Sequence, residues 1–334
     1  MKRTLLTLAI VLLSVFATQV AAQTRARNNA PATGGLMASL PESDAVAQIK
    51  LRQLLSEALP RIMGNNSVRL AEVNASIETF KTRTGLDPRM FEQLAVGLRF
   101  SHPSAGVTKV QTVALANGTF NPAAMVAAGR VASNGSYREE KYQGKTIYVF
   151  KLEENIRMVG LFNFRIDELA AAPLDANVLA LGDPAGVRAA IDAAGSRKRV
   201  NAELIALASR DPNAVIGFGG NVTEQLITNL DIGNAPIAAD LSKLRQFYGS
   251  VGTSETDLQL FLAARAVNAE AAKSLGDTLE GLKQFGALLV GRLSGARGVL
   301  AKSALANLQI VTQANELQIR TAVPQADLGP LMGN

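Results

Sequence analysis

The alternation of apolar and polar positions from residue 36 to residue 157 predicts a strand, a helical region, a hairpin, another helix and a second hairpin. Helical segments carry apolar residues at intervals of three and four, as Leu70, Val73, Ile77 and Phe80 do. The expected elements are a strand at 44–49, helices at 51–62 and 67–82, paired strands at 93–100 and 109–119, a helix at 121–132, and paired strands at 137–142 and 146–151.

A similar order returns after residue 212. It comprises a strand at 213–218, a helix at 222–230, paired strands at 247–252 and 258–266, a helix at 268–293, and paired strands at 308–312 and 317–321. Two pairs of similar segments support an internal repeat. The first pair is DAVAQI at 44–49 and NAVIGF at 213–218, and the second is GTFNPAAMVAAG at 118–129 and ARAVNAEAAKSLG at 264–276. We therefore predict an α+β fold with two related halves, antiparallel sheet or sheets, and helices packed on one face.

The segment between the halves, residues 158–211, is predicted to be a connecting module. Short apolar runs at 168–172 and 177–181 indicate strands, and helical spacing at 184–194 and 202–209 indicates two helices. The predicted organisation is therefore a first repeat at 36–157, the module at 158–211, and a second repeat at 212–334.

The first 22 residues have the pattern of a secretory signal peptide. Lys2 and Arg3 precede an apolar run at 5–16, and Val20, Ala21 and Ala22 supply small side chains for cleavage. Residues 23–35, QTRARNNAPATGG, have the composition of a disordered linker. We expect an exported protein, periplasmic or extracellular, with no transmembrane segment in the mature chain.

Composition restricts the compartment and the partners. The chain of 334 residues has no cysteine, so an exported form must rely on its packed core, which favours a bacterial periplasm. Removal of Lys2 and Arg3 with the signal peptide lowers the net charge from +6 to +4. Because this charge is dispersed and aromatic residues make up only 5%, nucleic acid is not expected as a partner.

Several segments together resemble a family of uncharacterised exported bacterial proteins. They are LPESDAV at 40–46, TGLDP at 84–88, GTFNPAAMVAAG at 118–129, YREEKYQGKTIYVF at 137–150 and LALGDPAGVRAAIDAA at 179–194. The resemblance covers most of the chain after Leu36 and implies a bacterial, exported protein. That family has no settled activity, so the resemblance assigns no functional residues.

The only histidine, His102, is the first candidate for chemistry. It is expected in an exposed loop, SHPSAG at 101–106. A cysteine nucleophile and a site with several histidines are both excluded by composition, so a hydrolase that pairs His102 with a serine is the remaining catalytic reading. We predict no catalytic, cofactor-binding or metal-binding residues.

Glycines at 217, 219 and 220 are expected between a strand and a helix, where backbone N–H groups can approach a phosphate. Val222 occupies the position at which the dinucleotide fingerprint requires glycine, and no GK[ST] follows. A tight turn therefore explains these glycines better than a nucleotide site does.

Charged clusters give two further candidates. Arg197, Lys198 and Arg199, with Arg188 nearby, and the looser pair Arg292 and Arg297 could contact a phosphate or anionic lipid, although solvated loops also carry such clusters. The adjacent carboxylates Glu139 and Glu140, like Glu153 and Glu154, are expected to point to opposite sides of a strand, so they do not form an acid and base pair.

The apolar face of the long helix can be read as a groove for lipid or for a partner. Its members are Ala272, Leu275, Leu279, Leu282, Phe285 and Leu289. Packing against the core is the simpler expectation for an amphipathic helix beside a sheet.

We therefore predict an exported, non-catalytic binding or assembly protein of the bacterial periplasm or envelope, whose partner is an unknown protein or envelope component. Two alternatives remain: a carrier that holds a hydrophobic ligand between sheet and helices, and a hydrolase that uses His102.

Overall fold

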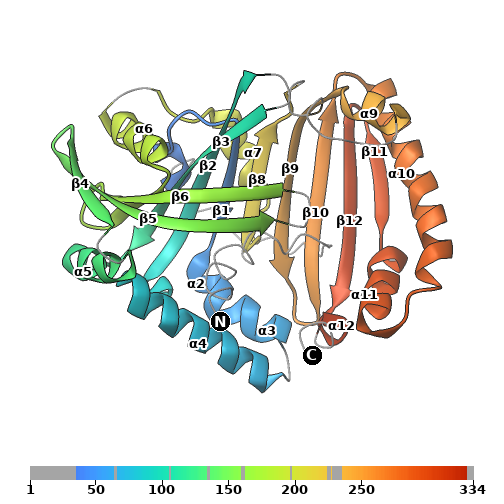
Figure 1. Ribbon diagram of the computed structural model, residues 1–334. Coiled ribbons are helices and arrows are strands. Elements are labelled where there is room, and N and C mark those ends of the chain that lie inside the picture. The colour runs from blue at the N-terminus through green and yellow to red at the C-terminus, as the bar shows by residue number, and fades with distance from the viewer. Residues whose placement is uncertain are drawn as a thin grey trace, which may run out of the picture.

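The computed structural model describes residues 35–63, 66–104, 107–133, 136–158, 162–195, 198–223, 227 and 235–328. They form one antiparallel sheet of 12 strands with helices around it (Figure 1), which confirms the predicted α+β class. The strand order is β11-β12-β10-β9-β8-β1-β2-β3-β7-β6-β5-β4. The predicted signal peptide and residues 23–34 of the predicted linker lie outside the described residues.

The first half of the chain supplies seven adjacent strands. They are β1 (Ala45–Ile49), β2 (Phe91–Ser104), β3 (Val107–Gly118), β4 (Tyr137–Tyr142), β5 (Lys145–Met158), β6 (Phe162–Pro173) and β7 (Val178–Gly182). Its helices are η1 (Gly35–Ser39), a continuous run of α2 (Leu51–Gln53), η2 (Leu54–Ala58) and α3 (Leu59–Met63), then α4 (Ser67–Thr84), η3 (Pro88–Met90) and α5 (Pro122–Ala132). At the β4–β5 turn, Gln143 and Gly144 have φ values of 44° and 75°, which fits the predicted two-residue hairpin.

The second half continues the same sheet. Its strands are β8 (Ile216–Asn221), β9 (Leu244–Thr253), β10 (Asp257–Ala266), β11 (Gln309–Gln313) and β12 (Glu316–Pro324), and its helices are α9 (Ala235–Leu241), α10 (Ala269–Val290), α11 (Gly295–Ala306) and α12 (Gln325–Leu328). Most of the helix predicted at 222–230 lies outside the described residues. Helix α11 was not predicted.

The two halves meet at the centre of the sheet, where β1 pairs antiparallel with β8. Ala45 lies opposite Gly220 and Ile49 lies opposite Ile216, so the similar segments DAVAQI and NAVIGF are direct neighbours in the sheet. Each repeat therefore contributes a strand, helices and two hairpins in the predicted order, β6 and β7 come from the predicted connecting module, and all these strands share one sheet.

The second pair of similar segments, at 118–129 and 264–276, also has a structural counterpart. Helices α5 and α10 each follow the second strand of a hairpin, and each begins at an asparagine N-cap. The Asn121 side chain accepts hydrogen bonds from the N–H groups of Ala123 and Ala124, and the Asn268 side chain accepts one from Ala271. The same local chemistry therefore starts the corresponding helix in both halves.

Helices of the repeats and helices of the connecting module cover opposite faces. Met125 of α5 belongs to the core on one face of the sheet. Leu275 of α10 packs with Ala264 of β10. Residues an even number of positions apart on a strand point to the same face, so Ala264 lies on the same face as Leu260, which belongs to the core that contains Met125. Helices α6 (Pro184–Gly195) and α7 (Ala202–Ala208) pack on the other face with η1. Helices therefore cover both faces of the sheet: α5 and α10 of the two repeats lie on one face, and η1 with the two helices of the connecting module lies on the other.

An ion cluster joins α4 to the turn before β2. Asp87 accepts from Arg89 Nε at 2.9 Å and lies 3.3 Å from Lys81 Nζ, while Glu78 also pairs with Arg89. The hydrogen bond from Arg89 is the main reason that the pKa of Asp87 falls to about 2. The charged form of Asp87 is thus stabilised by the fold.

This cluster predicts a loss of stability in acid. Because the folded-state pKa lies below the ordinary 3.8, the contribution of Asp87 is present above about pH 4 and is lost as the pH falls towards 2. We expect the free energy of unfolding, measured by urea titration, to fall less between about pH 5 and about pH 2.5 in Asp87→Asn than in the wild type. Equal losses in the two proteins would contradict this prediction.

Candidate functional site

Helix α10 is anchored at its N-terminal half. Ala271, Ala272 and Leu275 are buried against β10 and β12. Asp240 of α9 accepts hydrogen bonds from Ser274 Oγ at 3.0 Å and from Thr278 Oγ1 at 3.1 Å. Lys243 also binds this carboxylate, and the hydrogen bond from Lys243 is the main cause of the lowered pKa of Asp240. The start of α10 is therefore fixed by both core packing and a buried carboxylate.

Beyond Leu279, α10 no longer buries its apolar side chains. Phe285 is 59% exposed and Leu288 is 74% exposed, values that belong to solvent-facing residues. We define the apolar tip as Leu282, Phe285, Leu288, Leu289, Leu293 and Val299. These six residues come from the end of α10, the turn after it and the start of α11, and they make up half of the large exposed hydrophobic residues of the described chain. The apolar tip is therefore a concentrated surface.

Helix α11 returns from the apolar tip towards the sheet. Its main contact in the sheet is β12, where Thr321 Oγ1 donates a 2.7 Å hydrogen bond to the carbonyl of Ala304. Leu305 lies beside Gly286 of α10. In Figure 1, α10 and α11 stand at the end of the sheet that carries β11. The two helices form a hairpin anchored at both ends, with the apolar tip between the anchors.

The charges around the apolar tip are basic. From 281 to 315 the chain contains Lys283, Arg292, Arg297 and Lys302 and no acidic residue. Arg292 and Lys302 are exposed, whereas Lys283 is partly covered and lies 3.7 Å from Glu280. The region combines exposed apolar side chains with a positive potential.

His102 lies on a strand, because β2 extends to Ser104 and includes residues 101–104 of the expected SHPSAG loop, while residues 105 and 106 lie outside the described residues. The hairpin predicted at 93–100 and 109–119 is thus longer than expected at this end. Position 102 is at the far end of β2 from α2 and η3.

The glycines at 217, 219 and 220 lie within β8, so the predicted turn is wrong. A Cβ atom on Gly217 would lie 2.0 Å from the carbonyl oxygen of Ala208, and one on Gly219 would lie 2.8 Å from Leu207 Cβ. Gly217 and Gly219 therefore let α7 approach the sheet closely, whereas a Cβ atom on Gly220 would meet Phe247 and Ala45 instead. They serve packing, with no geometry of a phosphate loop.

The predicted charged clusters have structural partners. Arg188 forms a two-contact ion pair with Glu140, with Nε to Oε1 at 2.7 Å, and Arg199 Nε donates to the carbonyl of Ala193 at 3.0 Å. Glu139 pairs instead with Arg130 of α5, so the two adjacent glutamates do face opposite sides. Arg197 and the side chains of Glu153 and Glu154 lie outside the described part of the structure.

A polar network that the sequence did not indicate surrounds Tyr248. The Tyr248 ring is fully buried, and Arg210 donates to its hydroxyl group while Arg210 Cζ lies 4.7 Å from the ring centroid. Glu316 accepts from Gln318 Nε2 at 2.7 Å and pairs with Arg210 and Arg265. Burial is the main cause that raises the pKa of the Tyr248 phenol. Because its members satisfy one another, this network joins the turn after α7 to β9, β10 and β12 as a structural clamp.

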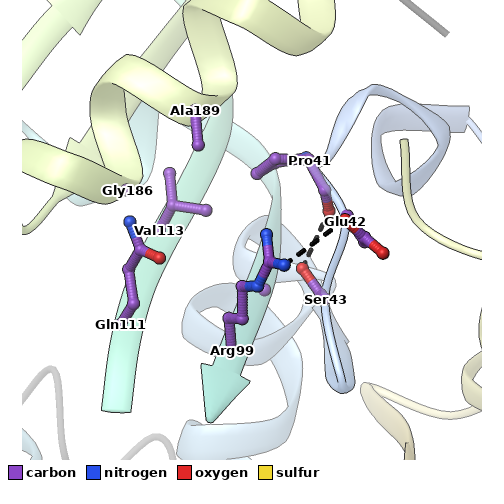
Figure 2. Close-up of a pocket in the computed structure, with 9 residues that line it drawn as sticks. Pro41, Glu42, Ser43, Arg99, Gln111, Val113, Gly186 and Ala189 are labelled. Atoms are coloured by element: carbon purple, nitrogen blue, oxygen red, sulfur yellow. Dashed lines mark hydrogen bonds and ion pairs between the residues drawn. The ribbon is translucent and has the colours of Figure 1, made fainter. Parts of the chain in front are cut away.

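A small pocket lies between the segment that joins η1 to β1, strands β2 and β3, and helix α6 (Figure 2). Arg99 and Glu42 form an ion pair of 3.5 Å at its rim, and Ser43 Oγ donates to the carbonyl of Pro41 at 2.8 Å. Its volume of about 20 Å³ has room for one water molecule. This pocket is much smaller than the roughly 300 Å³ of a small-molecule site, so it does not hold the hydrophobic ligand of the carrier hypothesis.

Within the described ranges, no three His, Asp or Glu side chains lie close enough together to hold a metal ion. No described helix is both long enough and apolar enough to span a membrane.

No family model matches this chain. No curated protein matches it either. Solved structures with a similar arrangement include three crystal forms of TP0453. Form III has a TM-score of 0.43 at 9% identity and covers 89% of this chain and 98% of its own. Form I has a TM-score of 0.43 at 9% identity, with coverages of 88% and 94%, and form IV has 0.44 at 8%, with coverages of 89% and 96%. At these values no functional argument rests on the similarity.

The expectation that the whole apolar face of α10 packs on the core is therefore wrong for its C-terminal half. Leu275 is buried as expected, but Leu282, Phe285 and Leu289 are exposed. Two sequence features do distinguish this half: four leucine or phenylalanine residues fall between 285 and 293, and acidic residues stop at Glu280. Together they mark an apolar, basic segment that differs from an ordinary core helix.

Proposed function

We propose that this chain is an exported, non-catalytic binding protein of the bacterial envelope, and that the apolar tip is its binding surface. The exposure of Phe285 and Leu288, together with their neighbours on the α10–α11 hairpin, is the observation that carries the proposal. Exposed apolar side chains that cluster on one surface mark interaction sites, since their burial by a partner is favourable. Export is supported by the signal-peptide pattern in residues 1–22.

The anchoring of the hairpin supports a binding role. Asp240 and the buried alanines fix the start of α10, and the hydrogen bond from Thr321 fixes the end of α11. A rigid support reduces the entropy that a binding surface loses when it meets its partner. The apolar tip is thus presented by the sheet in a defined position.

Fractionation of the bacterium that makes the protein tests this proposal. We expect wild-type protein in the envelope fraction, and the double variant Phe285→Ser with Leu288→Ser in the soluble exported fraction, because the variant loses apolar contact area. The matched control is Val68→Ser with Val131→Ser, which changes residues that are 68% and 79% exposed on α4 and α5. This control should remain with the envelope.

Two results would contradict the proposal. One is the same distribution for the tip variant and the wild type, and the other is retention of the wild type in the cytoplasm. Turnover of an ester, peptide or phosphate substrate that disappears in His102→Ala would instead support the hydrolase reading.

A further inference from the structure

We infer that the apolar tip binds an anionic phospholipid surface, with its apolar side chains in the lipid interface and its basic residues at the headgroups. This inference rests on the proposed function and names the partner of the same surface. Three observations support it: the angular spread of the apolar residues, the sign of the charge, and the way the hairpin is held.

The apolar side chains occupy a broad arc of α10. At about 100° per residue, Leu282, Phe285, Leu288 and Leu289 together cover an arc of about 120°. Glu280 and Lys283 fall on the opposite side of the helix. A helix that lies in a membrane interface has such a wide apolar arc opposite a polar one, because lipid surrounds its whole lower side.

The charge identifies the kind of surface. The four basic residues between 281 and 315 have no acidic neighbour in that stretch, and they surround the apolar residues in sequence. Lys and Arg beside an inserted apolar segment are attracted by acidic headgroups and can extend their charged ends to them. A membrane that carries anionic lipid satisfies both the apolar and the basic parts of the apolar tip.

The same charge disfavours a second copy of this chain as the partner. A symmetric contact places each surface patch against the equivalent patch of the other copy. Two apolar tips in contact would bring Arg292 and Lys302 of each copy close to those of the other. Like charges across an interface oppose association, so an anionic partner fits this surface better.

The depth of contact is limited by the fold. The N-terminal half of α10 is buried against the sheet, and α11 is bonded to β12, so only the end of the hairpin is free to enter lipid. The expected contact is therefore peripheral, with the sheet outside the bilayer.

Flotation with vesicles tests the inference on the full mature chain. The vesicles are phosphatidylcholine alone, or phosphatidylcholine with about one third phosphatidylglycerol, at low and high salt. We expect wild-type protein to float with the anionic vesicles and at least tenfold less with the neutral ones, and we expect added salt to weaken binding. Phe285→Ser with Leu288→Ser should lower binding at least tenfold, whereas Val68→Ser with Val131→Ser should not.

A charge-reversal pair tests the basic residues separately. Arg292→Glu with Lys302→Glu should lose binding to anionic vesicles, whereas Arg61→Glu with Lys109→Glu, which makes the same change in net charge away from the apolar tip, should retain most of it. Equal losses in the two double variants would overturn the assignment of the contact to the apolar tip.

Insertion can be measured directly because the chain contains no tryptophan. Leu288→Trp creates a single reporter on the apolar tip, and Val131→Trp creates one on α5. We expect the emission of the first to shift to shorter wavelength with anionic vesicles and the emission of the second to stay unchanged.

Failure of this inference is distinguishable from failure of the proposed function. If envelope association depends on Phe285 and Leu288 but no vesicle binds and the Leu288→Trp emission does not shift, the partner is a protein and the lipid inference is overturned. If neither envelope nor vesicles bind the chain, both are overturned.

Discussion

Replacement of Gly217 by alanine is expected to destabilise the protein by about 3 kcal/mol. The added methyl group would lie 2.0 Å from the carbonyl oxygen of Ala208, which belongs to the backbone of α7 and cannot rotate away. Relief of this clash requires α7 to move off the central strands, which opens the core that contains Leu204 and Leu207. Urea titration of the purified variant measures the loss.

Gly252 provides the matched control in the next strand. The nearest atoms to a Cβ atom at this position would be side-chain atoms of Gln259, 3.8 Å or more away, which is an ordinary van der Waals distance. Gly252→Ala should therefore change the free energy of unfolding by less than about 0.5 kcal/mol. If both variants unfold at the same urea concentration, close approach of α7 is not the reason for glycine at 217.

Replacement of Tyr248 by alanine is expected to cost about 4 kcal/mol. The ring is fully buried, packs edge-on against Phe261 with centroids 5.6 Å apart, and lies beneath the Arg210 guanidinium. Its removal leaves a cavity in the core and takes away the hydroxyl group that Arg210 binds. Unfolding followed by circular dichroism, with urea as denaturant, measures the change.

Tyr248→Phe separates the ring from the hydroxyl group. This variant keeps the packing and the cation–π contact but leaves Arg210 and Glu316 without the phenol, so we expect a loss of about 1 kcal/mol. A loss in Tyr248→Phe as large as that in Tyr248→Ala would show that the polar network, and not the packed ring, dominates the stability at this position.

The sequence predicted correctly those elements whose conformation is decided by their own residues. The β4–β5 hairpin was predicted from Gln143 and Gly144, whose positive φ values a two-residue turn requires. Helices α6 and α7 were predicted within one or two residues from helical spacing. In each of these cases, the residues that decide the conformation lie within the element itself.

Features that depend on distant segments were not predicted. The glycines of β8 were read as a turn, whereas Gly217 and Gly219 are needed because α7 packs on them from another part of the chain. The strands on either side of residues 101–106 were predicted to be shorter because His102 and Pro103 suggest a loop, whereas pairing of Ser104 with Val107 extends the hairpin. Tertiary pairing overrides local preference at both places.

The apolar tip shows the same limit for a candidate site. Periodicity could assign Leu282 and Leu289 to an apolar face, but it could not tell whether the sheet extends far enough to cover them. The sheet covers Leu275, and the helix then continues beyond it. The change from mixed to purely basic charge after Glu280 was available in the sequence and coincides with this transition.

The position of β1 has a consequence for how the chain acquires its structure during synthesis. One edge of β1 pairs with β2, which follows soon after it, but its other edge waits for β8, which is made only after the whole connecting module. Until then, the backbone N–H and C=O groups on that edge of β1 are unpaired and can join strands of another chain. We therefore expect incomplete chains that end before Ile216 to be prone to aggregate, and a chaperone that covers β1 to be most useful during that interval.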